Sequence, residues 1–360
     1  MKFDNVKKAK ALITLIFLGA LLLIFFSGSL ANIVADNRDS SELYWPAAPD
    51  TPRIKYLNSI ASPKDLKLKQ SSFLKRLVKK IVGFEETDAF LVSPYGVTTD
   101  SHNRLIVADP KARCVHVFDA QEKKYFSIKE PSNKDPFISV VAVAIDAEDN
   151  IYAADSASGK IFIFNRDGKF QKRLGADEGM FNRPSGIAID KQTRRLYVVE
   201  TVKGEVDVLT LEGTGLFKFG KRGAGEGEFN YPTHICIKGD RVLITDTFNA
   251  RIQIFNKDGK FISTLGRRGD GYGDLDKPKG VAMDSAGHIY VVEGLHDVVN
   301  IYDRDGSFLM AFGETGSHRG EFYLPTAIHI DADDNVYVAD SYNRRIQVFK
   351  YLKESNATRK

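Results

Sequence analysis

The hydrophobic and polar positions of this chain repeat with a period of 45 to 47 residues from residue 93 onward. One landmark of the repeat is an apolar triplet that ends in an acidic residue. These acids are Asp109, Asp155, Glu200, Asp246, Glu293 and Asp340. Within each unit, short runs of alternating apolar and polar residues predict four strands, as in GVAMD, HIYVVE, VVNIYD and SFLMAFG of the fifth unit. Turn-forming residues such as Asp, Asn and Gly separate these runs.

A unit of this kind cannot bury both of its faces alone, so neighbouring units have to pack against one another. Four-stranded antiparallel blades that repeat every 40 to 50 residues or so around a central axis form a β-propeller. We therefore predict an all-β fold, a six-bladed β-propeller, over residues 93–352. The six repeats are expected at about 93–136, 137–182, 183–230, 231–276, 277–323 and 324–352.

The last repeat lacks one strand. After RRIQVFKYL the chain continues into the polar tail 353–360, without a fourth apolar run. A candidate for the missing strand is PRIKYLNSI at residues 52–60, which resembles the fourth strands of the other units in length and apolar content. We expect this N-terminal strand to complete the last blade and to close the ring through hydrogen bonds.

The first 35 residues have the pattern of an export signal. Four lysines among the first ten residues precede 25 uncharged and largely apolar residues, 11–35. The segment fits a cleaved signal peptide and a retained transmembrane anchor equally well. In both cases the positive-inside rule places the rest of the chain outside the cytoplasm. We therefore expect an extracytoplasmic protein, periplasmic or at the cell surface, which is anchored in the membrane if the segment is retained.

Two further segments lie between the export signal and the repeats. Residues 36–51 are polar and contain prolines, which predicts a linker. Residues 61–92 connect the closing strand to the first repeat and contain a predicted amphipathic helix at 71–82, with four basic residues on its polar face. Such a helix lies on an anionic membrane surface or packs against the propeller with solvated lysines, and the second arrangement is the more common.

Composition and charge narrow the function classes. The chain is 43% hydrophobic and 27% charged, which is typical of a globular protein. The net charge of +4 is uneven, because residues 1–82 carry +8 and the remainder carries −4. Proteins that bind nucleic acids usually carry a basic cluster on the folded domain. The acidic propeller therefore argues against a nucleic-acid partner.

Motifs that carry chemistry are sparse. Cys114 and Cys236 lie in apolar, strand-like runs and are expected to be buried thiols. The sequence has no C-x-x-C pair, no G-x-S-x-G and no H-E-x-x-H. These absences argue against thiol redox chemistry, a zinc knuckle and a serine hydrolase. We predict no cofactor.

Two sets of residues in the repeat are candidates for a site. The six repeat acids occupy one structural slot, which is consistent with a cation site near the axis. However, the Asn and Arg residues that follow Asp246 and Asp340 favour a structural hydrogen-bond network that fixes each turn. His234 and His329 are predicted on innermost strands and are weak candidates for a channel metal site or for proton transfer. A structural histidine is the more common interpretation.

Three segments carry a resemblance to a known family. VADSYNRRIQVF (338–349), ITDTFNARIQIF (244–255) and GKRGAGEGEFNYP (220–232) resemble NHL repeats. The chain as a whole is similar to exported bacterial six-bladed NHL proteins. This resemblance implies a propeller that binds or scaffolds other molecules. It also implies an alternative, because amidating-lyase and lactonase relatives hold a divalent metal in the central channel.

The resemblance also implies two kinds of partner. Exported bacterial members resemble proteins that serve electron-transfer assemblies, which implies a multihaem cytochrome as one partner. Animal NHL domains bind RNA, but the acidic propeller and the export signal argue against RNA here.

We therefore expect a monomeric scaffold that binds a protein or ligand at the cell envelope without catalysis of its own. Loops on a rigid ring carry such recognition. The most irregular loops are 121–137 and 293–299, where Lys129, Lys134 and His296 are the candidate partner-binding residues. The alternative is a metal-dependent hydrolase or lyase that acts in the channel around His234.

Overall fold

The computed structural model describes residues 42–66, 90–129, 135–175 and 180–353. The chain divides into two units, Met1–Glu42 and Leu43–Lys360, and all of the described strands lie in the second. The predicted export signal, the helix predicted at 71–82 and the end of the tail lie outside the described residues. No helix among the described residues is long and apolar enough to cross a membrane.

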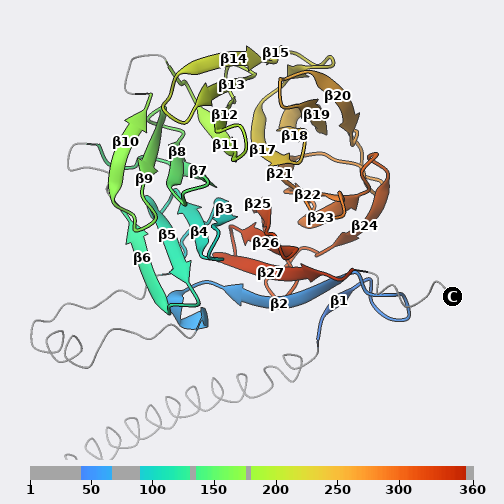
Figure 1. The fold of residues 1–360 in the computed structure, drawn as a ribbon. Helices are drawn as coiled ribbons and strands as arrows, with labels where there is room; N and C mark the ends of the chain where they lie inside the picture. Colours follow the sequence, from blue (N-terminus) through green and yellow to red (C-terminus); the bar gives the residue numbers. More distant parts are fainter. Residues whose placement is uncertain (1–41, 67–89, 130–134, 176–179, 354–360) are drawn as a thin grey trace, which may run out of the picture. The chain divides into compact units, whose positions relative to one another are not determined.

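Six antiparallel sheets surround a central axis and form the predicted six-bladed propeller (Figure 1). Blade one contains β3 (Gly96–Thr99), β4 (Leu105–Asp109), β5 (Cys114–Asp119) and β6 (Lys124–Ile128). Blade two contains β7 (Val140–Ile145), β8 (Ile151–Asp155), β9 (Lys160–Phe164) and β10 (Phe170–Leu174). Blade three contains β11 (Pro184–Asp190), β12 (Arg195–Glu200), β13 (Glu205–Thr210) and β14 (Gly215–Phe219).

The remaining blades follow the same order from the axis outward. Blade four contains β17 (Pro232–Lys238), β18 (Arg241–Asp246), β19 (Arg251–Asn256) and β20 (Phe261–Leu265). Blade five contains β21 (Pro278–Met283), β22 (Ile289–Glu293), β23 (Val298–Tyr302) and β24 (Phe308–Phe312). Blade six contains β25 (Pro325–Ile330), β26 (Asn335–Asp340) and β27 (Arg345–Tyr351). Short elements between them are β15 (Lys221–Arg222), β16 (Glu228–Phe229), and the 3-10 turns η1 (Pro63–Leu66) and η2 (Thr247–Asn249).

The missing strand of blade six comes from the other end of the sequence, as predicted. β2 (Ile54–Ile60) pairs antiparallel with β27, with Ile60 opposite Ile346 and Tyr56 opposite Phe349 (Figure 1). Hydrogen bonds between two distant segments therefore close the ring.

Blade six also has a fifth strand that the sequence pattern did not reveal. β1 (Tyr44–Trp45) lies within the segment expected to be a linker and pairs with β2. The Trp45 ring packs against Phe312 and Phe349, at centroid distances of 5.9 and 5.7 Å. A strand of two residues shows no alternation, so only this aromatic packing identifies it.

The first strands of the blades line the axis and run in the same direction. A Cβ atom added to Gly96 would lie 3.0 Å from the Cα of Ala142, at the equivalent position of the next blade, and 2.6 Å from the carbonyl oxygen of Val141. A Cβ atom added to Gly280 would lie 2.8 Å from the Cα of Ala327. Equivalent positions of neighbouring blades thus meet around the axis, and glycine permits that approach.

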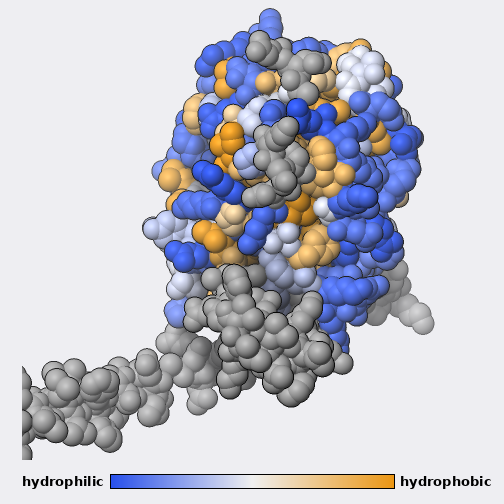
Figure 2. Space-filling model, turned by 90° about the vertical axis from the view of Figure 1, so that its left-hand side faces the viewer, coloured by the Kyte–Doolittle hydropathy of each residue, from blue (hydrophilic) through white to orange (hydrophobic). Residues whose placement is uncertain are grey.

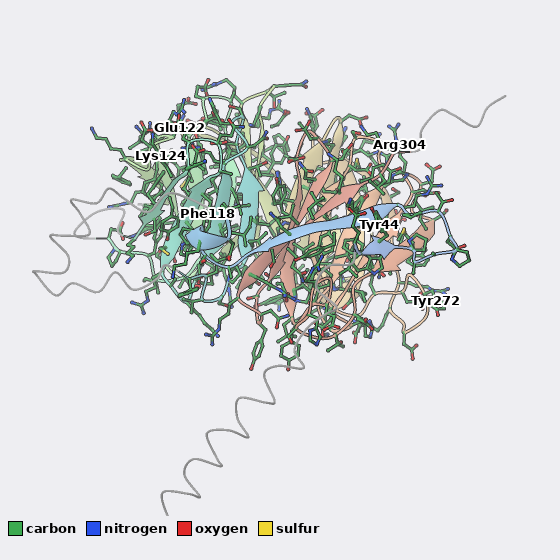
Figure 3. The ribbon with its side chains drawn as sticks, turned by 90° about the horizontal axis from the view of Figure 1, so that it is seen from below. Tyr44, Phe118, Glu122, Lys124, Tyr272 and Arg304 are labelled. Atoms are coloured by element: carbon green, nitrogen blue, oxygen red, sulfur yellow. The ribbon has the colours of Figure 1, made fainter. Side chains whose placement is uncertain are left out.

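This common direction gives the ring two distinct sides. We call the side where the first strands begin, at Pro184, Pro232, Pro278 and Pro325, the proline side. We call the side where they end, next to Asp100, Asp146, Asp190, Asp284 and Asp331, the aspartate side. Figure 3 shows the ring edge-on, with Tyr272 on the proline side and Glu122, Lys124 and Arg304 on the aspartate side.

The core lies between adjacent blades. Aliphatic and aromatic side chains of one sheet pack on those of the next, and each cluster of buried residues spans such a boundary, for example Val117 of β5 with Phe162 of β9. The outer surface is mixed, because the side of the ring that carries β6 and β10 shows hydrophobic side chains among hydrophilic ones (Figure 2). Burial between blades thus supplies most of the apolar contact in each repeat.

Candidate functional site

The six repeat acids are buried on the proline side and hold the backbone in place. Each lies at the end of its second strand, and its carboxylate accepts a hydrogen bond from the backbone N–H that stands two residues before the usual proline position. The donors are Val92, Ile138, Asn182, Asn230, Asp276 and Tyr323, at 2.6 to 3.0 Å. None of the six acids lines the channel. This geometry indicates that the acids hold the backbone of the loops in place and do not form a cation site at the axis.

Blades four and six add side-chain donors to this arrangement. Arg345 donates from Nε to Asp340 at 2.8 Å, and the side chain of Asn343 donates to the same carboxylate. Arg251 and Asn249 make the equivalent bonds to Asp246. Charge-assisted bonds of this kind are among the strongest in proteins, so the turns of these blades are firmly positioned.

The central channel contains a cavity of about 230 Å³ lined by the first strands of all six blades. Its walls are mostly aliphatic. The polar and sulfur-containing lining residues are Thr98, Thr99, Lys191, His234, Cys236, Lys238, Met283 and His329. The structure thus places both predicted histidines in the channel.

The two histidines differ in their partners. The Nε2 atom of His329 lies 2.9 Å from the hydroxyl of Thr99, across the boundary between the last blade and the first. No described residue forms a hydrogen bond with the ring of His234. Burial lowers the pKa of His234 to about 4 and also lowers the pKa of His329 to about 4, although the charge of Asp331 acts in the opposite direction. Both rings are therefore neutral at neutral pH.

The two cysteines occupy different environments. Cys114 is buried in blade one, as predicted, and burial raises the pKa of its thiol to about 12. The prediction for Cys236 was wrong in part, because this residue is half-buried and lines the channel. Cys236 lies on the innermost strand of blade four, whose residues line the channel, and is therefore less buried than the apolar pattern predicted. Burial still raises the pKa of the Cys236 thiol to about 11, so it is not an activated nucleophile.

The channel does not offer the ligand set of a divalent metal. No carboxylate belongs to its described lining. Among the described residues, the only His, Cys, Asp and Glu group with all ligand atoms within 4.8 Å of one another is Asp100, His102 and Asp149, of which only His102 is exposed. Arg104 already pairs with Asp100 at 2.5 Å, and His102 with Asp149 at 3.0 Å. The donors that a metal-dependent hydrolase needs do not converge here.

The proline side carries most of the exposed large hydrophobic residues. Fourteen such residues are exposed in the described parts of the chain, and ten of them lie in loops on this side. The ten are Phe90, Val92, Ile138, Val202, Phe248, Tyr272, Leu295, Tyr323, Leu324 and Tyr342. The other four, Leu57, Leu216, Ile262 and Leu309, lie on the fourth strands of their blades, β2, β14, β20 and β24.

Aromatic pairs and cations order part of this surface. The rings of Phe248 and Tyr231 stack at 4.6 Å, and the ammonium group of Lys277 lies 5.2 Å from the Phe248 ring. The rings of Tyr323 and Tyr342 meet edge-on at 4.5 Å. These contacts limit the orientations that the four aromatic rings can adopt.

Two of the three predicted partner-binding residues can be located. Lys129 follows β6 and His296 lies in the turn after β22, so both are exposed on the proline side. Lys134 lies outside the described residues. The structure does not bring Lys129 and His296 together, because they belong to blades one and five.

Sequence reasoning missed the exposed aromatic surface and the two channel lysines. A signal for the surface exists, because Val202, Phe248, Leu295 and Tyr342 each stand two residues after a repeat acid, in a turn where polar residues are expected. A signal for Lys238 also exists. It stands where the other five repeats have aspartate at the end of the first strand.

Comparisons with known proteins agree with this architecture. A family model described as a 6-bladed beta-propeller matches residues 225–295, and an NHL repeat model matches residues 322–349. The chain is 27% identical over 169 residues to the Protein brain tumor of Drosophila melanogaster. This match covers 46% of the chain but only 16% of that relative.

Solved structures of different function share the fold. A virginiamycin B lyase from Staphylococcus aureus has a TM-score of 0.53 at 14% identity, covering 72% of this chain and 96% of that one. A gluconolactonase from Xanthomonas campestris has a TM-score of 0.56 at 14% identity, covering 72% and 86%. An auxiliary nutrient binding protein from Bacteroides thetaiotaomicron has a TM-score of 0.57 at 14% identity, covering 73% and 70%.

These structures include lyases, a lactonase and a binding protein, so the shared fold does not select one function. The repeat pattern, the closed ring of six blades and the matching family models agree on one assignment. The chain is an NHL-repeat six-bladed β-propeller.

Proposed function

We propose that this propeller is a binding module that holds a partner protein against its proline side and has no catalysis of its own. The observation that carries the proposal is the one-sided distribution of exposed hydrophobic residues. Ten lie in loops on the proline side, and none of the fourteen lies in the turns on the aspartate side. A concentration of exposed apolar side chains on one side of a protein is typical of protein interaction sites.

The chemistry of the surface also supports a protein partner. Tyr231, Phe248, Tyr323 and Tyr342 form two aromatic pairs, and Lys277 lies beside the Phe248 ring. Aromatic residues are enriched among those that dominate binding energy in protein interfaces. The six buried acids hold the backbone of these loops through hydrogen bonds. The loops would therefore lose little conformational entropy when a partner binds.

A matched set of variants tests the proposal. In the full chain, Phe248→Ala combined with Tyr342→Ala should weaken partner capture by about tenfold or more, because such anchors contribute about 2 kcal/mol or more. Leu216→Ala combined with Leu309→Ala is the control, since these residues are similarly exposed but lie on outermost strands. Capture is measured by crosslinking in the native cells and quantitative mass spectrometry.

Two results would contradict the proposal. In the first, the aromatic double variant folds with an unchanged melting temperature and captures the same partner equally well. In the second, the control variant loses the partner to the same extent as the aromatic variant. Either result would remove the proline side as the binding surface.

We further propose that the module acts outside the cytoplasm, at the cell envelope. The four lysines followed by 25 uncharged residues support this location. Protease added to intact cells, or to cells with a permeabilised outer layer, should then digest the propeller while a cytoplasmic marker survives. Mass spectrometry of the isolated chain decides whether residues 1–35 are retained. Complete protection from protease under both conditions would contradict an extracytoplasmic location.

A further inference from the structure

The end of the first strand in blade four differs from that in every other blade. Five blades have a buried aspartate there, whose carboxylate accepts backbone N–H bonds from the turn that comes next. Asp146, for example, accepts from Glu148 at 3.0 Å and from Asn150 at 2.8 Å. Blade four has Lys238 instead, and its turn is shorter, because Lys238 pairs directly with Arg241 across Gly239 and Asp240. This turn does not need a bracing carboxylate.

Lys238 is instead part of the channel lining, together with Lys191 from blade three. Neither lysine forms an ion pair with any described residue. Lys191 is exposed, so the cavity reaches solvent on the aspartate side. Two cations without partners among the described residues thus stand at one end of a largely aliphatic cavity.

The acids near this end of the channel already have partners and do not line the cavity. Asp190 pairs with Lys257 at 2.9 Å, and Asp100 pairs with Arg104. The remaining three aspartates accept hydrogen bonds within their own turns, where Asn150 donates to Asp146, His288 to Asp284 and Asn335 to Asp331. None of the five belongs to the cavity lining.

We propose that the channel binds a small organic carboxylate from the aspartate side, with its head group at Lys238 and Lys191 and its apolar chain among the aliphatic walls. The neutral rings of His234 and His329 and the cavity of about 230 Å³ leave room for a short chain beyond the lysines. This site is separate from the partner surface on the proline side. Its existence does not depend on the proposed protein partner.

Three probes of the same length test the charge requirement. Hexanoate, hexanamide and hexylammonium are titrated into the full chain by isothermal titration calorimetry at low salt. Hexanoate should bind about tenfold or more tightly than hexanamide, because a charged hydrogen bond is worth more than a neutral one. Hexylammonium should bind least. If hexylammonium binds best, the buried aspartates set the local potential and the proposal is wrong.

Substitutions test the residues. Lys238→Met keeps the length of the side chain without its charge and should weaken hexanoate binding by about tenfold while leaving hexanamide binding unchanged. Lys260→Met is the control, because Lys260 is exposed on the aspartate side in a turn between outer strands. Circular dichroism melts confirm that both variants fold. Equal hexanoate binding by a folded Lys238→Met protein would overturn the proposal.

Nuclear magnetic resonance locates the bound ligand. Hexanoate should shift the imidazole signals of His234 and His329 in the 15N-labelled chain, since both rings line the cavity. The signals of His318, which is exposed in a proline-side loop, should not move. Saturable binding that leaves both channel histidines unperturbed would place hexanoate elsewhere and would overturn the channel site.

Discussion

At the scale of single residues, the position of a side chain in the blade decides what its chemistry can do. The repeat acids are fully buried, and backbone N–H groups surround their carboxylates, so they serve the loops of the proline side. His234 replaces a small residue next to the axis and has no hydrogen-bond partner among the described residues. The strand that carries a residue therefore decides whether its side chain supports a loop of the proline side or lines the channel.

The channel histidines predict a loss of stability in acid. Burial lowers the pKa of His234 to about 4, whereas an unfolded histidine titrates near 6.5. Between these values the unfolded chain takes up a proton that the folded chain does not, so stability falls as the pH drops from 6.5 to 4. Each histidine should contribute about 1 kcal/mol per pH unit to this fall.

The measurement is urea unfolding at pH 7 and pH 5. His234→Gln should lose less unfolding free energy between the two values than the unchanged protein, because one protonation is removed. His318→Gln is the control, since His318 is exposed in a surface loop. An identical pH dependence for the two variants would show that His234 does not titrate abnormally.

At the scale of elements, the last blade depends on a strand from the far end of the sequence. The strand has one buried and one exposed side: Ile54, Tyr56 and Ile60 are buried, whereas Leu57 is 44% exposed. Pairing with β27 covers an edge that would otherwise expose unsatisfied backbone groups. The blade is therefore complete only when both segments are present.

Ile54 provides a direct measure of this closure. Ile54→Ala should lower the free energy of unfolding by about 2 to 4 kcal/mol, because the side chain is fully buried and its loss leaves a cavity. Leu57→Ala on the same strand should change it by less than about 1 kcal/mol. Deletion of residues 50–62 should lower the melting temperature sharply. An unchanged melt of the deletion variant would contradict closure by β2.

The sequence predicted elements better than sites, for a physical reason. The period of 45 to 47 residues and the alternation of apolar and polar residues result from burial between blades. This burial is the same in every repeat, so the strands could be predicted. The strand at 52–60 was recognisable because it has the pattern of a fourth strand. β1 was not, because Tyr44 and Trp45 alone carry no period. Lys238 was overlooked because its neighbours in the sequence do not mark it as unusual. It stands out only when its position is compared with the aspartates at the equivalent positions of the other five repeats.

At the scale of the whole molecule, the ring separates two surfaces that face opposite ways. The proline side is rich in exposed aromatic and aliphatic residues. The aspartate side opens into a cavity with two lysines. Because the two surfaces lie on opposite sides of the ring, the proposed protein partner and the proposed carboxylate ligand would not compete for the same residues.

The donor set of the channel predicts that no metal is held there. The lining has two neutral histidines and no carboxylate among the described residues, so calcium and zinc lack sufficient ligands. Elemental analysis of the full chain, purified without chelator, should find no calcium, zinc or iron that depends on His234. EDTA should leave the melting temperature unchanged. About one metal per chain that disappears in His234→Ala would instead favour the hydrolase or lyase alternative.

Because β2 pairs with β27, the ring can close only after nearly the whole chain has been synthesised. Residues 54–60 leave the ribosome long before residues 345–351, so the first of the two partners waits while five blades are made. Contacts this distant in sequence form slowly, and unpaired strand edges invite association between chains. A nascent chain interrupted before residue 345 therefore has an open ring with a free β2 edge.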